Sequence, residues 1–439
     1  MGYDVIVVGG GIAGLTTGAL LAAGGTRVLV LEVRPVLGGR GLVVRQGGFT
    51  LNYGYHFILG AWGSPHARVL KRLGLPVRAR ATWASGFARA RRGRLQRFPA
   101  ELLSTFRFFG FHDGLGYLGK GLGWLRKPAG PYMTTTLADF LAEERVSPRV
   151  AEWLLDIIRA IGFTAHPERF SAGHFLEFAR FNVRHQLRPS LVLPWDALFE
   201  ALRAAIVDRG GAVRLRAPVD RVEISGGRAA GVWTTGRLLE ARVVILALPP
   251  QRAACLLPPG VLEGPGGRPA TELRPTAGIS LDLGVEGEWD LPWIAVDLAD
   301  EGVVLARHSF VNPDLAPPGH TLFQAMRFVD ADELADGERI EMHKQALLRA
   351  VETVYPGATQ RVVLKRWLVR RMLTAAEHAA DQPWLALPPV QAPGVPNLLF
   401  CGDGYRAPGE LSNAAVHSAE EAAGIAAALL RAGPQRKAG

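Results

Sequence analysis

The sequence predicts an α/β fold joined to an α+β part, and three observations carry this prediction. A continuous apolar run at residues 5–8 leads into a glycine-rich turn, an Ala- and Leu-rich helix, and a second apolar run at residues 28–31. Parallel strands that are covered on both faces have such continuous runs. A strand meander at residues 212–250, and a strand followed by a long helix at residues 396–431, continue the pattern. This alternation is typical of a parallel sheet covered by helices.

Length and composition indicate a globular protein of two domains. The chain has 439 residues, of which 48% are hydrophobic and 21% are charged, and this composition excludes a disordered or fibrous protein. One hydrophobic core rarely spans such a length. We expect a first domain assembled from residues 1–75, 196–270 and 390–439, interleaved with a second domain assembled from residues 76–195 and 271–389.

The sequence carries no signal for export or for a metal centre. No apolar run approaches the roughly 18 residues that span a bilayer. The N-terminal segment contains Asp4 and no basic stretch, so it is interpreted as a buried strand and not as a signal peptide. Two cysteines, Cys255 and Cys401, are too few for a disulfide framework or a metal cluster. We therefore expect a cytoplasmic protein with no metal site.

Positive charge is concentrated in one segment. The net charge is +10, and residues 78–127 alone contain 11 basic and 2 acidic residues. Such a local excess argues against a nucleic-acid-binding surface. Aromatic residues interleave with the basic ones from Phe98 to Trp124, and this combination suits a peripheral contact with an anionic membrane. The alternative is that these aromatic residues belong to the core of the second domain, beside a solvated hairpin.

Local patterns predict the remaining elements. Residues 86–99 alternate like a β-hairpin, whereas residues 111–124 are glycine-rich and have no clear period. Residues 134–181 are expected to be helical, beginning at threonines that cap a helix. A further helix is predicted at residues 196–208, and strands with one helix are predicted within residues 274–375.

The first chemical motif is a Gly-x-Gly-x-x-Gly turn between the first strand and helix. Gly9, Gly11 and Gly14 allow a tight turn and bring backbone N–H groups close to a pyrophosphate at the helix N-terminus. Glu32 ends the second strand, where a carboxylate accepts hydrogen bonds from a ribose and disfavours NADP. The complete arrangement predicts a Rossmann-like dinucleotide site. Two further residues of this turn are expected to contact the cofactor: Ile12 and Ala13.

A second glycine turn follows at once, because residues 32–40 read E-V-R-P-V-L-G-G-R. Here the chain resembles the flavoproteins that include phytoene desaturases, amine oxidases and protoporphyrinogen oxidases. In that superfamily a Gly-Gly-Arg turn folds over the diphosphate of FAD. The resemblance therefore implies FAD as the cofactor, with Arg34 and Arg40 supplying positive charge near the phosphates. It also assigns three neighbouring residues to the cofactor site: Val33, Gly38 and Gly39.

A third motif lies near the C-terminus. In the resembled superfamily a strand ends in Gly-Asp, which matches Gly402 and Asp403, and the aspartate binds the ribityl or phosphate part of FAD. The next helix directs its N-terminus at the flavin pyrimidine ring, where a helix N-terminus stabilises negative charge. Leu411 lies at this helix end, and Ser412 and Asn413 are expected to cap it.

The flavin itself is expected to lie beside Gly54, Tyr55 and His56. The resemblance places these residues next to the isoalloxazine, where His56 is a candidate proton acceptor, a pocket-shaping residue, or an ordinary structural histidine. A weaker match implies that the backbone of Val219 meets the adenine. No serine–histidine–aspartate, paired-carboxylate or metal-ligand spacing stands out in the sequence, so the catalytic residues are left open, with Tyr55 and His56 as the candidates.

The resemblance implies an FAD-dependent oxidoreductase that dehydrogenates C–C bonds of an apolar, isoprenoid- or carotenoid-like molecule, with oxygen or a quinone as electron acceptor. Many amine oxidases have a lysine at the flavin, and the matching strand at residues 275–283 has none. The alternatives are an amine oxidase or protoporphyrinogen-type oxidase, a redox-neutral double-bond isomerase, and a non-catalytic FAD-binding scaffold.

Overall fold

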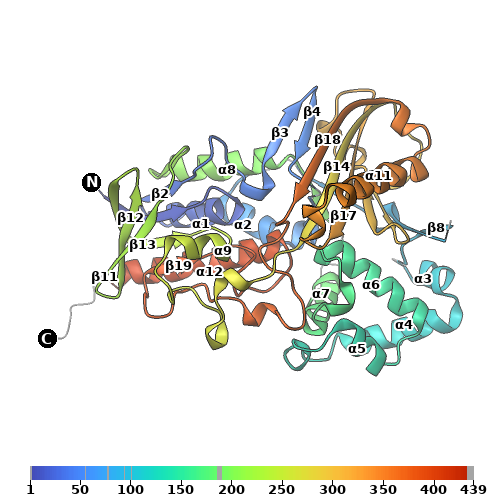
Figure 1. Ribbon diagram of the computed structural model, residues 1–439, viewed down its shortest axis with the longest axis horizontal. Coiled ribbons are helices and arrows are strands. Elements are labelled where there is room, and N and C mark those ends of the chain that lie inside the picture. Colours follow the sequence, from blue (N-terminus) through green and yellow to red (C-terminus); the bar gives the residue numbers. More distant parts are fainter. Residues whose placement is uncertain are drawn as a thin grey trace.

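Two seven-stranded sheets, each covered by helices, make up most of the chain (Figure 1). The first sheet and its helices form one half of the molecule, and the second sheet and a group of short helices form the other half. The first and the last described residues lie at the outer end of the first half. The computed structural model describes residues 2–54, 56–76, 79–92, 94–99, 101–184 and 190–432.

The first sheet combines a parallel part and an antiparallel part. Its parallel strands are β10 (Ala212–Arg214), β2 (Val28–Leu31), β1 (Tyr3–Val8), β13 (Arg237–Leu246) and β19 (Leu398–Phe400), in this order. The outer end of β13 also pairs antiparallel with β12 (Arg228–Thr234), which pairs with β11 (Arg221–Ser225). The order confirms the parallel sheet and the meander that the sequence predicts.

Alternate side chains of the parallel strands pack on opposite faces of this sheet. Val5 and Val7 contribute to a core that includes side chains of α1 (Ile12–Ala23), α8 (Trp195–Val207) and α12 (Ser412–Arg431). Ile6 and Val8 point to the other face. Because both faces are covered, the strands need apolar residues at every position.

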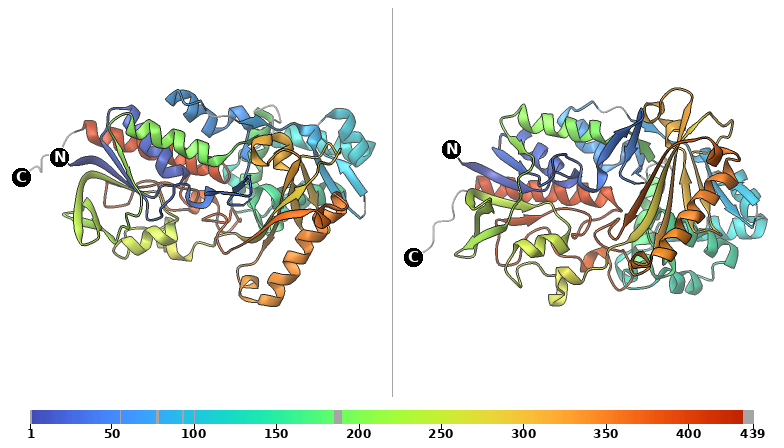
Figure 2. Two further views of the ribbon diagram at one scale, coloured as in Figure 1. Left: turned by 90° about the horizontal axis from the view of Figure 1, so that it is seen from above. Right: turned by 45° about the horizontal axis from the view of Figure 1, so that its top comes forward.

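The outer face of the second sheet is covered by one long helix. Its strand order is β18 (Val362–Arg370), β14 (Ala277–Glu286), β17 (His320–Val329), β16 (Val303–Ala306), β15 (Ala295–Leu298), β7 (Phe87–Arg91) and β8 (Arg94–Arg97). Helix α11 (Gly337–Val354) covers the outer face (Figure 2). Ile279 and Leu281 pack toward α11, so the alternating residues Ser280 and Asp282 face the interior of the molecule.

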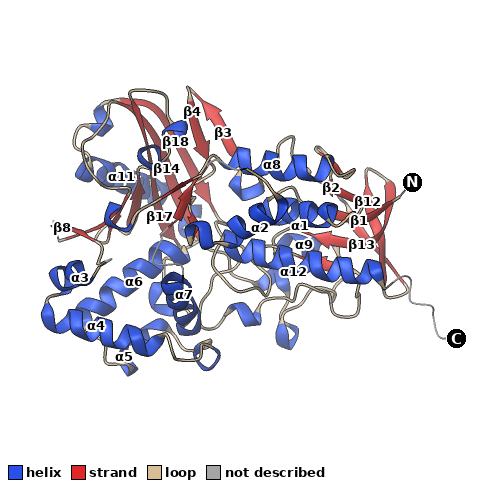
Figure 3. Cartoon of the chain, turned by 180° about the vertical axis from the view of Figure 1, so that it is seen from behind, coloured by secondary structure: helices blue, strands red, loops and turns tan. Residues whose placement is uncertain are grey.

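Five helices gather below the inner face of the second sheet (Figure 3). They are α3 (Leu102–Phe109), α4 (Phe111–Trp124), α5 (Leu137–Glu143), α6 (Pro148–Gly162) and α7 (Ala172–Arg184). Thr136 caps α5, since its hydroxyl accepts a hydrogen bond from the Asp139 N–H at 3.1 Å, as predicted. Within the described helices, no stretch is both long and apolar enough to cross a membrane.

Helix α4 is the element that the sequence patterns missed. Its 14 residues contain several glycines, and each glycine lowers the propensity for helix by about 1 kcal/mol relative to alanine. Tertiary contacts compensate, because Trp124 is buried against Phe140 and Phe175. Packing in the helical group therefore overrides the local preference.

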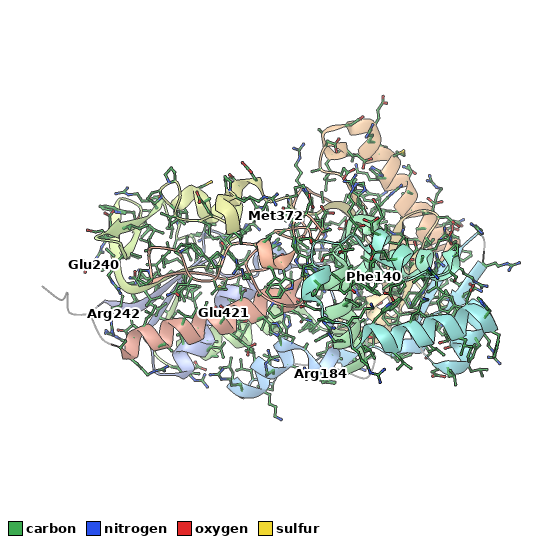
Figure 4. The ribbon with its side chains drawn as sticks, turned by 90° about the horizontal axis from the view of Figure 1, so that it is seen from below. Phe140, Arg184, Glu240, Arg242, Met372 and Glu421 are labelled. Carbon is green, nitrogen blue, oxygen red and sulfur yellow. The ribbon has the colours of Figure 1, made fainter. Side chains whose placement is uncertain are left out.

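The remaining elements are short. They are β3 (Val43–Gln46), β4 (Phe49–Asn52), β5 (Ile58–Leu59), β6 (Arg80–Ala81), β9 (Ser190–Val192), α2 (Pro65–Leu73), α9 (Pro250–Ala253) and α10 (His308–Val311). The long connections between the two halves meet at the centre of the molecule, where Met372 lies (Figure 4).

Candidate active site

The first glycine turn is built by contacts that exclude side chains at two of its three glycines. Gly9 has φ 111°, and a Cβ atom there would lie 2.5 Å from the Ala247 carbonyl oxygen. A Cβ atom at Gly14 would collide with the Gly9 carbonyl oxygen. Gly11 is different, since a Cβ atom there would meet nothing closer than 3.9 Å. The protein itself does not need a glycine at position 11, and the absence of a side chain there leaves space for a bound group beside the helix N-terminus.

Glu32 is positioned by two backbone N–H groups. Its Oε2 accepts a hydrogen bond from Gly10 at 2.7 Å, and its Oε1 accepts one from Arg34 at 2.9 Å. These bonds hold the carboxylate beside the glycine turn and leave each oxygen a further lone pair for a ribose hydroxyl.

The Gly-Gly-Arg turn lies against the first glycine turn. The Gly38 N–H donates to the Gly10 carbonyl at 2.9 Å, and Gly38 has φ 118°. Arg40 forms a bidentate ion pair with Asp403, in which one of the two bonds measures 2.7 Å. Burial alone would raise the pKa of the Asp403 carboxyl, but Arg40 holds this pKa below its ordinary value. The two residues that the sequence assigns separately to FAD thus act as one pair.

Arg370 is a site residue that the sequence patterns did not indicate. Its guanidinium lies 3.5 Å from the centre of the Tyr53 ring, and its Nη2 is buried with no described partner. Burial and the nearby Arg34, Arg40 and Arg366 lower the pKa of Arg370 to about 10. An excess of positive charge of this kind fits a diphosphate, which would give the unpartnered nitrogen an acceptor.

This arrangement predicts that substitutions of two arginines of β18 affect different properties, one FAD affinity and the other the stability of the apoprotein. Arg370→Met should raise the dissociation constant for FAD at least about tenfold, because it removes a charge-assisted bond, while the melting temperature of the apoprotein changes little. Arg366→Met should lower that melting temperature, since Arg366 pairs with the buried Asp282. Fluorescence titration with FAD and thermal melts of both apoproteins test this contrast, and equal FAD affinity in Arg370→Met and wild type would contradict it.

Helix α12 begins at Ser412, so the residues expected to cap it already belong to the helix. Leu411 occupies the N-cap position of α12 with φ 55°, and no side chain caps this end. The expectation that Ser412 and Asn413 cap the helix is therefore wrong, because both lie inside its first turn. Asn413 instead bonds to His66 Nδ1 at 3.2 Å and donates to the Leu59 carbonyl at 3.1 Å.

The loop before α12 is held by a buried carboxylate between two histidines. Glu410 accepts hydrogen bonds from His174 Nδ1 at 3.1 Å and from His378 Nδ1 at 2.8 Å. His174 Nε2 accepts from the Trp384 N–H at 3.0 Å, so its proton lies on Nδ1. Although these three side chains have the composition of a metal site, this tautomer directs a proton, and not a lone pair, at Glu410. The cluster links α7 to the start of α12.

His56 is a neutral histidine at the junction of the two halves. Its Nδ1 lies 2.9 Å from the Gly54 carbonyl oxygen, which also accepts from Gln324 Nε2 at 3.2 Å. Gln324 in turn donates to Asp282 at 2.6 Å. Burial lowers the pKa of His56 to about 4. When Nδ1 carries the proton and donates it in a hydrogen bond to the Gly54 carbonyl, Nε2 has no proton. Its lone pair is then able to accept one. Tyr55 lies outside the described residues.

One cavity of about 1450 Å³ brings these residues together. It is lined by most of the residues that the sequence assigns to the cofactor: Gly9, Gly11, Ile12, Ala13, Glu32, Val33, Arg34, Gly38, Gly39, Arg40, His56, Val219, Gly402, Asp403, Leu411 and Ser412. Gly14, Gly54 and Asn413 lie behind this lining, where they shape the backbone. Gly11, with its open side, and Arg370, with its unpartnered nitrogen, both line this cavity, which has room for a dinucleotide. The residues present therefore fit FAD.

Comparisons with known proteins show what the chain is similar to. Amine oxidase [flavin-containing] A of Bos taurus is 27% identical over 274 residues, which are 57% of this chain and 50% of that protein. The chain thus spans about half the length of the curated relatives it matches. Two solved structures share the fold. One is an oxidoreductase from Methanosarcina mazei, with a TM-score of 0.78, 18% identity and coverage of 95% of this chain and 99% of that chain. The other is cyclohexylamine oxidase from Brevibacterium oxydans, with a TM-score of 0.64, 18% identity and coverage of 98% and 100%.

The family model for flavin containing amine oxidoreductases matches residues 12–426, from the first glycine turn to the last helix. This match runs through both sheets, the helical group and the cavity between them. The chain belongs to the flavin containing amine oxidoreductase family.

Proposed function

We propose that this FAD-dependent oxidoreductase dehydrogenates C–C bonds of an apolar, isoprenoid-like molecule. The shape and lining of the cavity support this proposal. Beyond His56 the cavity continues between α4, α6 and α7, where apolar side chains form its walls: Leu118, Leu122, Trp153, Ile157, Ile161, Phe175 and Phe178. A large, mostly apolar space suits an apolar substrate.

The residues of the chain supply position, a proton acceptor and the exclusion of water. Bound FAD supplies the chemistry of hydride acceptance, and oxygen or a quinone then takes the electrons. His56 Nε2 is suited to take the proton that leaves with the hydride, since the Gly54 carbonyl fixes the other ring nitrogen. Trp195 packs edge-on against His56 at 5.4 Å between ring centres, which restrains the orientation of the imidazole.

The charges along the cavity favour a neutral substrate over an amine. No lysine is found among the described residues that line the cavity. In the apolar part, the buried carboxylate is Asp297, and it is already paired with Arg159 at 3.0 Å. An ammonium group would lose its hydration there without gaining an uncompensated negative charge.

The test is anaerobic bleaching of the flavin spectrum by phytoene, by cyclohexylamine and by protoporphyrinogen IX. We expect phytoene to bleach the flavin and the other two compounds to leave it oxidised. His56→Gln should slow this bleaching by about 10²- to 10⁴-fold if it removes a general base, whereas His66→Gln, at a buried histidine outside this cavity, serves as the matched control. Bleaching by the amine or the porphyrinogen alone would assign the enzyme to the oxidase alternatives. Conversion of a poly-cis carotenoid only after prior reduction of FAD would assign it to the isomerases.

The same proposal includes a membrane as the source of the substrate. Leu102 on α3 and Leu122 on α4 both line the cavity and are 63% and 60% exposed, so they mark its mouth. Phe111 beside them is 76% exposed. Arg107 and Lys120 lie on the same two helices. Exposed apolar residues among basic ones suit the surface of an anionic bilayer.

Flotation with vesicles tests this contact. The FAD-loaded enzyme should float with phosphatidylglycerol vesicles, float less with pure phosphatidylcholine vesicles, and lose binding in high salt. The double variant Leu102→Glu/Phe111→Glu should reduce flotation at least about tenfold, because two apolar side chains no longer enter the interface. Val363→Glu, at a residue 54% exposed on β18, is the matched control. Equal flotation of all three proteins would contradict the contact.

A further inference from the structure

One acidic residue, Asp297 on β15, lines the apolar half of the cavity. The pairing register places Ser280, Met326, Val304, Asp297 and Arg89 side by side on five consecutive strands of the second sheet. Met326 and Val304 are buried and apolar. Asp297 is 4% exposed and lines the cavity. A carboxylate in this position needs a partner, since burying an unpaired charge is costly.

Asp297 belongs to a chain of buried ion pairs. Its Oδ1 accepts from Arg159 Nη2 at 3.0 Å, and Arg159 Nη1 lies 3.1 Å from Asp156 Oδ1. Asp156 also pairs with Arg89. No described residue donates a hydrogen bond to the second oxygen of Asp297, and this side chain borders the cavity. The network therefore leaves one acceptor for a ligand.

The charge of the network indicates which ligand group fits. Arg89, Arg159, Asp156 and Asp297 contribute two positive and two negative charges when all four are ionised. Arg91, which also pairs with Asp156 at 3.3 Å, adds a further positive charge. A cation in the cavity would find no net negative charge, whereas a neutral donor would form a hydrogen bond to a carboxylate oxygen. Such bonds to charged groups are stronger than those between neutral groups.

A second unpartnered polar atom lies on the same cavity. Trp153 is 7% exposed and lines the cavity, and its Nε1 is buried with no described partner. Buried indole N–H groups usually find an acceptor. The apolar half of the cavity thus offers both an acceptor and a donor, and a hydroxyl group is able to use either.

We propose that Asp297, held by Arg159, is a subsite that recognises a hydroxyl group on an otherwise apolar substrate. The proposal rests on the proposed function and adds, within its apolar substrate class, a preference for molecules that carry a hydroxyl group. Met326 approaches Gly54, next to His56, and Asp297 lies two strands farther across the sheet, at about 10 Å from the strand spacing. The hydroxyl group would therefore be bound at a distance from the reacting carbons.

The experiment compares geranylgeraniol with its methyl ether, which has the same chain and no donor. Quenching of tryptophan fluorescence in the FAD-loaded enzyme measures both affinities without turnover. We expect wild type to bind the alcohol about tenfold more tightly than the ether. Asp297→Asn should reduce this ratio to near 1, and Asp297→Glu, which keeps the charge that faces Arg159, should lower it as well. Thr105→Val removes another hydroxyl from the cavity lining and should leave the ratio unchanged.

Each outcome decides the proposal. A wild-type preference that disappears in the Asp297 variants supports it. Equal affinity of wild type for alcohol and ether overturns it, and so does a preference that survives in both variants. Failure of both compounds to bind also overturns it. Bleaching of the flavin by phytoene, measured separately, reports on the proposed dehydrogenation alone, so the two failures are distinguishable.

Discussion

Replacing Gly11 by valine is expected to abolish FAD binding while the apoprotein stays folded. A Cβ atom at position 11 meets no protein atom within 3.9 Å, so the substitution costs the fold little. The same atoms would enter the space that a diphosphate needs beside the N-terminus of α1. We expect the purified variant to lack the absorbance of bound FAD and its dissociation constant to rise at least about 100-fold, which corresponds to roughly 3 kcal/mol.

Two glycine variants make this expectation specific. Gly14→Val should fail to fold, since its Cβ atom would collide with the Gly9 carbonyl oxygen. Gly424→Ala lies in α12 with open space around it and should retain FAD with unchanged or higher stability. Thermal melts of the three apoproteins and FAD titration of the folded ones complete the test. Normal FAD content in Gly11→Val would show that the diphosphate does not bind at the first glycine turn.

The stability of the protein is expected to fall steeply as the pH drops from 6.5 to 4. Burial lowers the pKa of His56, His66, His174 and His308 to about 4. A histidine whose folded pKa lies below its unfolded value stabilises the fold above the unfolded pKa and loses that contribution on acidification. Each of these four groups binds about one proton more in the unfolded state within this window.

Two buried acids act in the opposite direction. Burial raises the pKa of Asp297 to about 6 and raises that of Asp282 as well. Their contribution grows as the pH falls and offsets part of the loss from the histidines. His378 acts in the same direction as these acids, because Glu410 raises its pKa. We expect the four histidines to dominate, so that the free energy of unfolding decreases as the pH falls.

Urea denaturation of the apoprotein at pH 7, 6 and 5, followed by circular dichroism, measures this slope. His66→Gln should reduce the slope by about one proton, because it removes one buried titrating group while glutamine still bonds to Asn413. Equal stability at pH 7 and pH 5 would contradict the assignment of these histidines as buried and neutral.

The nucleotide end of the site was predictable because its chemistry is local in sequence. Gly9, Gly11, Gly14 and Glu32 lie within one strand–helix–strand unit, and a single turn sets their relative positions. The Gly-Gly-Arg turn follows in the same segment. Backbone approach to a diphosphate demands glycine at fixed spacing, so residue type and position together carry the information.

The substrate end of the cavity and the arginine assigned to the diphosphate were not predictable, because these residues meet only through the pairing of distant strands. Arg370, Gln324 and Asp297 come from three strands of the second sheet, and each looks like an ordinary strand residue in the sequence. A one-residue change of register would turn each of them to the outer face. The glycines of α4 concealed a helix for a related reason, since only its packing partners compensate for their low helix propensity.

The pairing of β13 with both β1 and β19 has a consequence for how the protein acquires its cofactor. Tyr3 pairs with Ala241, and Leu246 pairs with Phe400, while Arg40 and Asp403 are 363 residues apart. A chain growing from the ribosome therefore exposes its dinucleotide motif long before the strands that complete the sheet exist. Long-range pairing of this kind slows folding and favours partly folded states. We therefore expect FAD to bind late, after translation is complete. Until then the incomplete sheet is the species that chaperones would have to protect.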